Sequence, residues 1–239
     1  MTSQVESMLD GLFDLVFPPK CISCGNLNPH YLCASCLTEI APVPRPYCMR
    51  CGHPMFRNRC SSCWGRVRSF EAARAAGDYS GILRDAIHAF KYGGARALAD
   101  PLAHLLCRYL TMSSDIPWRR AECIIPVPMY PAKERIRGYN QSVLLAECLG
   151  DMIGLPVLTN VLQRRVSTKA QVALSGKRRR ENVVGAFGVS PPEAGELSGK
   201  TVLLVDDVAT TCSTIHECSV TLLGAGARRV YVACLAFGA

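Results

Sequence analysis

"VLLVDDVATTCST", Val202 to Thr214, begins with four apolar residues and continues with two adjacent aspartates and a turn rich in hydroxyl groups. The apolar run predicts a strand from Lys200 to Val205 that is buried on both faces. The acidic pair could simply end this strand, with Ser213 or Thr214 capping the next helix. Ligands of open α/β sheets, however, bind beyond the carboxyl ends of strands and at helix N-termini. On that interpretation the turn holds an anion and the aspartates hold the hydroxyl groups of a sugar.

The same stretch resembles the signature of type I phosphoribosyltransferases, in which an apolar strand leads into two acidic residues and a Thr-Thr-Gly-x-Thr-like loop. The resemblance implies that the acidic pair binds the ribose hydroxyls of phosphoribosyl pyrophosphate (PRPP) and that the loop binds its 5-phosphate. The family usually has glycine where this chain has Cys212, and a Cβ restricts close approach and positive φ. The PRPP-binding residues implied in this way are Asp206, Asp207, Val208, Ala209, Thr210, Thr211, Cys212, Ser213 and Thr214.

The composition of the 239-residue chain, 49% hydrophobic and 19% charged, is typical of a globular protein with one or two domains. No apolar stretch reaches the ~20 residues of a transmembrane helix. The first twenty residues have no basic region of the kind that opens a signal peptide. Their apolar residues, from Met8 to Val16, instead fit a short amphipathic helix. We therefore expect a cytoplasmic protein, in which thiols stay reduced.

Eight of the fourteen cysteines form two units of the pattern C-x2-C-x8-C-x2-C, with the second unit 27 residues after the first. Four thiolates at this spacing suit one tetrahedral Zn²⁺ per unit, and an interleaved pairing of the knuckles stays open. A disulfide framework fits worse because nothing indicates secretion, and a thioredoxin-like motif usually has a single CxxC. The predicted zinc ligands are Cys21, Cys24, Cys33, Cys36, Cys48, Cys51, Cys60 and Cys63.

A segment as short as this double zinc ribbon buries too little apolar surface to fold by itself, so zinc binding is expected to supply the free energy that folds it. His30 and His53 lie inside the units and are expected to be bystanders, because cysteines already fill both sites. The rings of Tyr47, Phe56 and Trp64 either pack the small core or offer a surface to a protein partner. We assign residues 1–70 to the N-terminal helix and the ribbon.

Residues 71–239 alternate between strand and helix patterns, which predicts βαβ units and a parallel sheet. The fold class expected is thus α/β, and the resemblance of the signature stretch implies that this is a phosphoribosyltransferase-like domain behind a small zinc ribbon. The predicted strands are 71–79, 123–128, 155–158, 183–189, 200–205 and 229–235. The predicted helices are 80–94, 97–111, 140–154 and 213–223.

Two basic stretches lie where a PRPP enzyme needs functional loops. The first, "PVPMYPAKERIRGYNQS", leaves a strand, carries Lys133, Arg135 and Arg137, and could bind a pyrophosphate. The second, Arg164 to Arg180, has seven cations and no acid, and is either a mobile active-site loop or a solvated surface. Residues 1–70 have a formal charge of +3, which two zinc–tetrathiolate centres would lower to about −1. The +5 of residues 71–239 therefore dominates the basic surface.

Taken together, the motifs resemble the ComF family over nearly the whole chain, from Pro18 to Phe237. The matching features are the cysteine array, "KYGG" at 91–94, "PVP…RGYNQS", "T..Q..LS...R..N..GAF" from 168 to 187, and the signature strand. The family resembles a phosphoribosyltransferase fold joined to a zinc ribbon. Some members are tied to natural competence, in which single-stranded DNA enters the cytoplasm.

Three functions stay open on the sequence alone. The first is binding of PRPP with Mg²⁺ and transfer of its 5-phosphoribosyl group to an unidentified acceptor, with Asp206, Asp207 and Arg137 as catalytic residues. The second is a non-catalytic DNA-uptake protein whose basic loop tracks a single strand. The third is a regulator that senses PRPP. A basic surface suits pyrophosphate and a nucleic-acid backbone equally.

Overall fold

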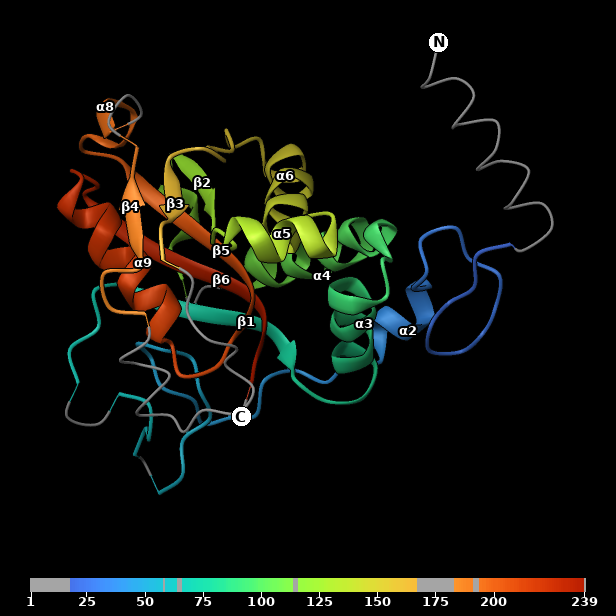
Figure 1. The fold of residues 1–239 in the computed structure, drawn as a ribbon. Coiled ribbons are helices and arrows are strands. Elements are labelled where there is room, and N and C mark those ends of the chain that lie inside the picture. The colour runs from blue at the N-terminus through green and yellow to red at the C-terminus, as the bar shows by residue number, and fades with distance from the viewer. Residues whose placement is uncertain are drawn as a thin grey trace, which may run out of the picture.

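A computed structural model describes residues 18–57, 59–63, 66–113, 116–166, 183–190 and 194–238 (Figure 1). The predicted N-terminal helix, the ring of Trp64 and the basic stretch from 167 to 182 lie outside the described residues. No helix in the described ranges is long and apolar enough to cross a membrane.

The described elements follow one another in an alternating order. They are α2 (Ala34–Thr38), β1 (Ala72–Asp78), α3 (Gly81–Tyr92), α4 (Ala99–Met112), β2 (Cys123–Pro126), α5 (Pro131–Arg137), α6 (Gln141–Ile153), β3 (Leu162–Arg164), β4 (Phe187–Val189), α8 (Ala194–Leu197), β5 (Thr201–Ala209), α9 (Ser213–Gly224) and β6 (Arg229–Phe237). Short 3-10 turns at Arg96–Leu98 and Trp118–Arg120 precede α4 and β2.

The central sheet has the strand order β1-β6-β5-β2, and each neighbouring pair is parallel. This arrangement confirms the predicted α/β class with a parallel sheet. The prediction that the signature strand ends at Val205 is wrong, because β5 continues to Ala209. The strand continues because β6 runs beside it to Phe237, which pairs with Ala209. The acidic pair therefore lies inside β5 rather than beyond it.

Helices cover both faces of the sheet, α4 and α6 on one side and α9 on the other (Figure 1). Alternation along β5 assigns its side chains to two separate cores. Leu203 and Val205 pack with α4 and α6, whereas Val202 and Leu204 pack with α9. Strands with apolar residues on both faces are typical of parallel sheets enclosed in this way.

The two halves of the cysteine array join different cores. Cys21 and Cys36 are buried with the side chains of α3 and α4. Cys51 and Cys60 are buried with those of β6 and α9, on the opposite face of the sheet. The N-terminal segment thus extends the hydrophobic cores of the sheet on both sides. The division of the chain into two domains at residue 70 stays a prediction from the sequence.

Three other segments differ from the sequence prediction. The stretch from 155 to 158 makes only the bridge of Val157 with Ile124, and the strand predicted at 183–189 is reduced to β4. β4 pairs antiparallel with β3, which the sequence did not predict. The stretch predicted as a basic loop contains α5, which begins at Pro131 and ends at Gly138 with a φ of 84°. Proline at the first helical position and a left-handed glycine after the last are normal helix boundaries.

Candidate functional site

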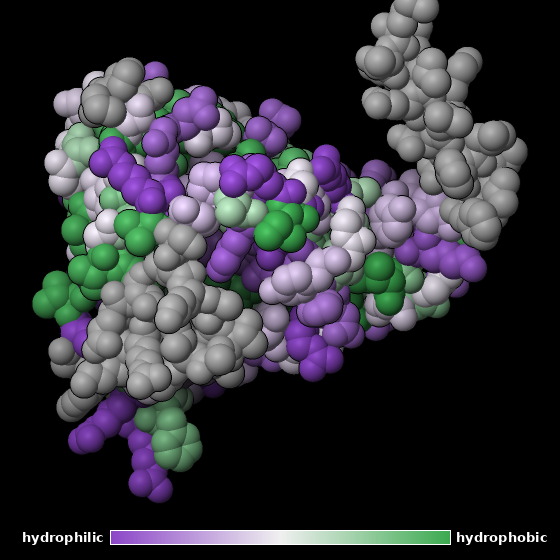
Figure 2. Space-filling model, in the orientation of Figure 1, coloured by the Kyte–Doolittle hydropathy of each residue, from purple (hydrophilic) through white to green (hydrophobic). Residues whose placement is uncertain are grey.

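A cleft of about 1060 Å³ opens where β5 and β6 end. Its walls come from α3, the β2–α5 connection, α5, the start of α6, β5 and the start of α9. Open parallel sheets bind their ligands at this edge. Hydrophilic side chains gather over α5 at this side of the molecule (Figure 2), and none of the residues of α5 is buried.

Asp206 and Asp207 line the cleft but have little contact with solvent, with exposed fractions of 8% and 4%. The Oδ1 atom of Asp207 lies 2.9 Å from the Nζ atom of Lys91. Its Oδ2 atom accepts a hydrogen bond of 2.5 Å from the Nε2 atom of Gln141. The Oδ1 atom of Asp206 accepts hydrogen bonds from the hydroxyl of Ser142, at 3.1 Å, and from the backbone N–H of Asp207, at 2.9 Å. The acidic pair is therefore held in one orientation by neighbours from two helices.

Burial and the adjacent charge of Asp207 raise the pKa of Asp206 to about 7. Two neighbouring carboxylates in a poorly solvated place cannot both ionise freely. Burial by itself would lower the pKa of Lys91, but the charges and hydrogen bond of the aspartates outweigh it and raise the pKa. Near neutral pH, Asp206 is therefore partly protonated while Lys91 stays charged.

Three of these neighbours were missed as site residues from the sequence: Lys91, Gln141 and Ser142. Their signals were present, because they lie in the "KYGG" and "RGYNQS" segments that support the family resemblance. Asn140 begins α6, and its side chain accepts a hydrogen bond from the backbone N–H of Ser142 at 3.0 Å. This cap fixes the first turn of α6, so that two consecutive residues can each reach one aspartate.

Arg137, predicted to act on the pyrophosphate, lines the cleft. One of its guanidinium N–H groups donates a hydrogen bond of 2.5 Å to the Oε1 atom of Gln141. The same guanidinium lies over the ring of Tyr92, 5.1 Å from its centroid. Gln141 thus connects Arg137 with Asp207.

Four cations share the cleft with the acidic pair: Lys91, Lys133, Arg137 and Arg164. Burial, assisted by the positive charges of Arg164 and Arg137, lowers the pKa of Lys133. Such mutual repulsion between cations is relieved when an anion binds among them. The predicted Arg135 is not among the residues that line the cleft, and of the second basic stretch only Arg164, Arg165 and Val166 are described.

The hydroxyl-rich turn lies at the same cleft. Val208, Ala209, Thr210, Cys212, Ser213 and Thr214 line it. Thr211 is not among the lining residues, and its hydroxyl pairs with that of Ser213 at 2.8 Å. α9 begins at Ser213, so its first backbone N–H groups and the positive end of its dipole lie at the turn. The arrangement suits a phosphate.

Cys212 has a φ of 56° and a ψ of 15°, in the left-handed region that the family's usual glycine adopts without strain. Its side chain is 2% exposed and points away from solvent. Cysteine in place of glycine at this position therefore keeps the left-handed backbone and adds a buried thiol.

The cleft is a poor cage for Mg²⁺ on its own. Three of the four carboxylate oxygens of the acidic pair already accept a hydrogen bond or an ion pair from the protein. Mg²⁺ usually takes one or two carboxylates together with substrate phosphates. The residues present would suit an ion that enters with a phosphate ligand and takes one carboxylate from the protein.

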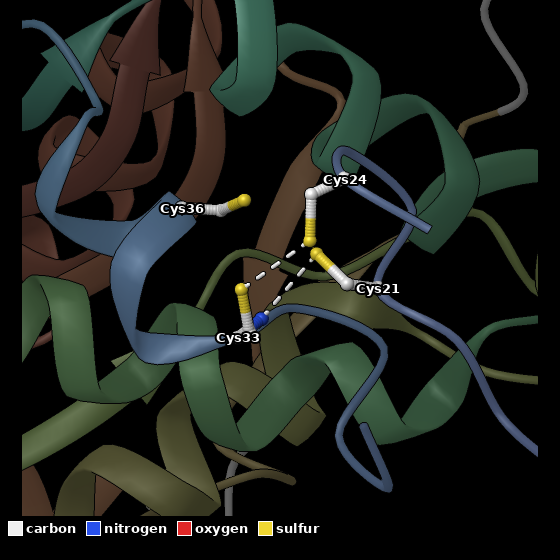
Figure 3. A group of neighbouring side chains, drawn as sticks. All are labelled: Cys21, Cys24, Cys33 and Cys36. Carbon is white, nitrogen blue, oxygen red and sulfur yellow. Dashed lines mark hydrogen bonds between the residues drawn. The ribbon is translucent and has the colours of Figure 1, made fainter. Parts of the chain in front are cut away.

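The eight predicted zinc ligands form two clusters, Cys21, Cys24, Cys33 and Cys36 in one and Cys48, Cys51, Cys60 and Cys63 in the other. Within each cluster all sulfur atoms lie within 4.8 Å of one another, and those of the first converge on a common point in Figure 3. The pairing is therefore local, not interleaved. Four thiols at this separation match the donor set of a structural zinc site.

The 27-residue repeat extends to the backbone of the knuckles. Gly25 and Gly52 both have a φ of 75°, and each donates its N–H to the carbonyl of the first cysteine of its unit. An antiparallel bridge closes the turn in each unit, between residues 20 and 27 in the first and between residues 47 and 54 in the second. Both units thus present their cysteines from one local structure.

Of the rings considered for a partner surface, that of Tyr47 has two guanidinium groups near it, those of Arg45 and Arg74, at 5.4 and 5.3 Å from its centroid. Phe56 is 77% exposed, and the guanidinium of Arg57 lies 5.3 Å from its ring centroid. Of the two described rings of this set, Phe56 is therefore the more exposed, and Tyr47 is half-buried.

Comparisons with known proteins match two families within the chain. The double zinc ribbon domain family matches residues 12–64, and the phosphoribosyl transferase domain family matches residues 151–239. Among solved structures, the chain is similar to a Bacillus subtilis glutamine PRPP amidotransferase, with a TM-score of 0.39 and 19% identity over 59% of this chain and 26% of that chain.

Curated relatives match over most of the chain. It is 34% identical to the Competence protein F of Haemophilus influenzae, over 89% of this chain and 94% of the relative. It is 30% identical to the DNA utilization protein YhgH of Escherichia coli O157:H7, over 85% and 89%. It is 24% identical to the Competence protein ComFC of Bacillus subtilis, over 82% and 79%. The chain therefore belongs to the ComF family, in which a double zinc ribbon is joined to a phosphoribosyltransferase-like domain.

Proposed function

We propose that the cleft binds the 5-phosphoribosyl group of PRPP together with Mg²⁺. The observation that carries the proposal is the meeting of an acidic pair, a hydroxyl-rich turn at a helix N-terminus and four cations in one cleft. The turn from Thr210 to Thr214 would hold the 5-phosphate, and Asp206 and Asp207 would accept hydrogen bonds from the ribose hydroxyls. Lys133 and Arg137 would face the pyrophosphate.

Transfer of the phosphoribosyl group would use the same contacts. The bond from C1 of the ribose to the pyrophosphate oxygen breaks, and the electron pair leaves with the pyrophosphate while the acceptor's nucleophile bonds to C1. Cations positioned at the leaving group stabilise the negative charge that develops there, and Mg²⁺ would add to that stabilisation. The acidic pair would hold the ribose as positive charge develops at C1.

Calorimetry with PRPP and Mg²⁺ tests binding directly. Asp206→Asn and Asp207→Asn each remove a charge-assisted hydrogen bond, which is worth about 1.5–3 kcal/mol, and should lower the affinity tenfold to hundredfold. Asp151→Asn, at an exposed position late in α6, should bind as the wild type does. Wild-type protein that binds no PRPP at millimolar concentration would refute the proposal.

Binding of single-stranded DNA is a second candidate, because relatives are named for competence and DNA utilization. The basic stretch that would contact DNA includes Arg178, Arg179 and Arg180, which lie outside the described residues. Neutralising these three arginines should flatten the salt dependence of DNA binding, since each lost phosphate contact removes about 0.7 from the log–log slope on a single strand.

Competition separates the functions. PRPP should displace a labelled oligonucleotide if both use the cleft, and DNA binding untouched by PRPP would indicate two sites. Protein that binds PRPP but releases no pyrophosphate, whichever acceptor is offered, would act as a sensor rather than a transferase.

A further inference from the structure

The phosphate turn contacts the second cysteine cluster, which belongs to the other part of the chain. The sulfur of Cys212 lies 3.6 Å from the Nδ1 atom of His53. The donor atoms of Cys51, His53 and Cys212 all lie within 4.8 Å of one another, and Cys51 is also a predicted zinc ligand. His53, expected to be a bystander, therefore lies between the knuckle and the turn. Its ring packs on Phe237, with centroids 4.5 Å apart.

Arg68 forms a second connection at an independent point. One nitrogen of its guanidinium donates to the carbonyl of Ser62, at 2.5 Å, and to the carbonyl of Thr211, at 3.1 Å. Ser62 stands between two cysteines of the second cluster, and Thr211 precedes Cys212 in the phosphate turn. Arg68 is only 7% exposed, so these bonds form away from water, where they hold the two segments together strongly.

A third connection reaches the helix that follows the turn. The backbone N–H of Ser69 donates to the Nδ1 atom of His216, at 3.2 Å, in the first turns of α9. The knuckle is thus joined to the residues on either side of Cys212 as well as to Cys212 itself. A non-glycine residue keeps a left-handed backbone only where its surroundings hold it there. These contacts supply that constraint.

The first cysteine cluster offers a built-in contrast. It packs on the opposite face of the sheet. Within the described part of the chain, no hydrogen bond or ion pair joins residues 18–40 to residues 206–216. The two zinc sites therefore differ in their relation to the cleft although they share one local structure.

We propose that the second cysteine cluster acts as a positioning device for the phosphate turn, with Arg68, His53 and Cys212 as the positioning residues. Zinc at Cys48, Cys51, Cys60 and Cys63 holds the knuckle, and the knuckle holds the turn in the conformation that receives a phosphate. The ligand-binding half of this inference rests on the proposed function. Coupling between two sites is reciprocal, so a phosphoryl ligand in the turn retains zinc in the second cluster by the same factor.

Hydrogen exchange on the full chain tests the structural half without any ligand. Cys63→Ser should weaken zinc binding in the second cluster and speed exchange in residues 206–216 by about 5- to 150-fold, the usual range of such couplings. Cys24→Ser, which removes one ligand from the first cluster, should leave exchange in those residues at the wild-type rate. Equal exchange in both variants, fast or slow, would overturn the proposal.

A second pair of variants decides the matter if Cys63→Ser does not fold. Arg66 and Arg68 both donate to the carbonyl of Ser62, but only Arg68 reaches the phosphate turn. Arg68→Ala should therefore speed exchange in residues 206–216 and Arg66→Ala should not. Arg68→Lys, which keeps one donor, should recover part of the protection. Wild-type exchange in Arg68→Ala would contradict the role of this residue.

The reciprocal measurement is the rate at which a chelator removes zinc. PRPP with Mg²⁺ should slow release from the second cluster and leave release from the first unchanged, and Arg68→Ala should abolish the difference. A wild-type protein that binds PRPP but releases both zinc ions at unaltered rates would refute the linkage. A protein that binds no PRPP would refute the proposed function, while the exchange experiments would still decide whether the knuckle positions the turn.

Discussion

Lys91 and Asp207 form an ion pair with 2.9 Å between Nζ and Oδ1, and their side chains are 19% and 5% exposed. The pair connects the end of α3 with the acidic end of β5. A charge pair that is this poorly solvated stabilises a structure only when both partners are present, because either partner alone would be a buried charge. Lys91 also neutralises one of two adjacent carboxylates and so reduces the repulsion between them.

Lys91→Met should therefore destabilise the protein substantially. Breaking a buried pair by removing one partner costs about 3–5 kcal/mol, and here the remaining carboxylates would also repel each other. Urea unfolding near neutral pH measures the loss. The double variant Lys91→Met with Asp207→Asn should be more stable than the single one, because it removes the uncompensated charge. Arg84→Gln serves as the control, since Arg84 pairs with Asp85 in solvent and exposed pairs contribute little. Equal losses in Lys91→Met and Arg84→Gln would contradict this account.

The stability of the protein should fall as pH rises from about 4 to about 7, through the contribution of Asp206. Its pKa is about 7 in the folded protein, raised by burial and by Asp207, and about 3.9 in an unfolded chain. Between these values the folded state binds a proton that the unfolded state has lost, so each pH unit costs up to about 1.4 kcal/mol. Asp206→Asn should remove this slope.

Unfolding curves of wild type and Asp206→Asn at several pH values test the expectation. Asp85→Asn, at an exposed position on α3, should keep the wild-type slope. A slope that survives in Asp206→Asn would assign the pH dependence to another group.

Much of the fold follows from local sequence, whereas the site depends on contacts between distant segments. The run from Val202 to Val205 predicts a buried strand, and the cysteine spacing predicts two local zinc sites, because both signals depend on neighbouring residues. The pairing of Lys91 with Asp207 has no local signal, since it arises only when α3 packs beside β5. The extension of β5 past the aspartates also has no local signal in the sequence, because the length of its partner strand β6 determines it. The same holds for the two cysteine clusters, whose packing on opposite faces follows from the path of residues 18–70 around the sheet.

Purified protein should contain about two Zn²⁺ per chain, one in each cysteine cluster. Cys24→Ser and Cys63→Ser should each lower the zinc content by one ion, and the double variant should hold none. Elemental analysis measures the content, and a thiol assay on native protein should find the eight ligands protected. Protein without zinc whose fourteen cysteines all react would end this interpretation.

Replacing Cys212 separates backbone strain from side-chain contact. A left-handed backbone costs a non-glycine residue about 1–2 kcal/mol, and glycine avoids this cost at a smaller expense of unfolded-state entropy. Cys212→Gly and Cys212→Ala both lose the thiol that contacts His53, but only alanine retains the Cβ. We therefore expect Cys212→Gly to be more stable than Cys212→Ala by about 1 kcal/mol in urea unfolding.

The same variant makes a prediction about the ligand. PRPP affinity should be unchanged or higher in Cys212→Gly, because the loop returns to the residue usual in phosphoribosyltransferases. The PRPP affinity of Cys212→Gly should depend less on zinc than that of the wild type, because the contact between the Cys212 thiol and His53 is gone. Equal stability of the glycine and alanine variants would show that the backbone at this position is unstrained, and the constraint assigned to Arg68 and His53 would then be unnecessary.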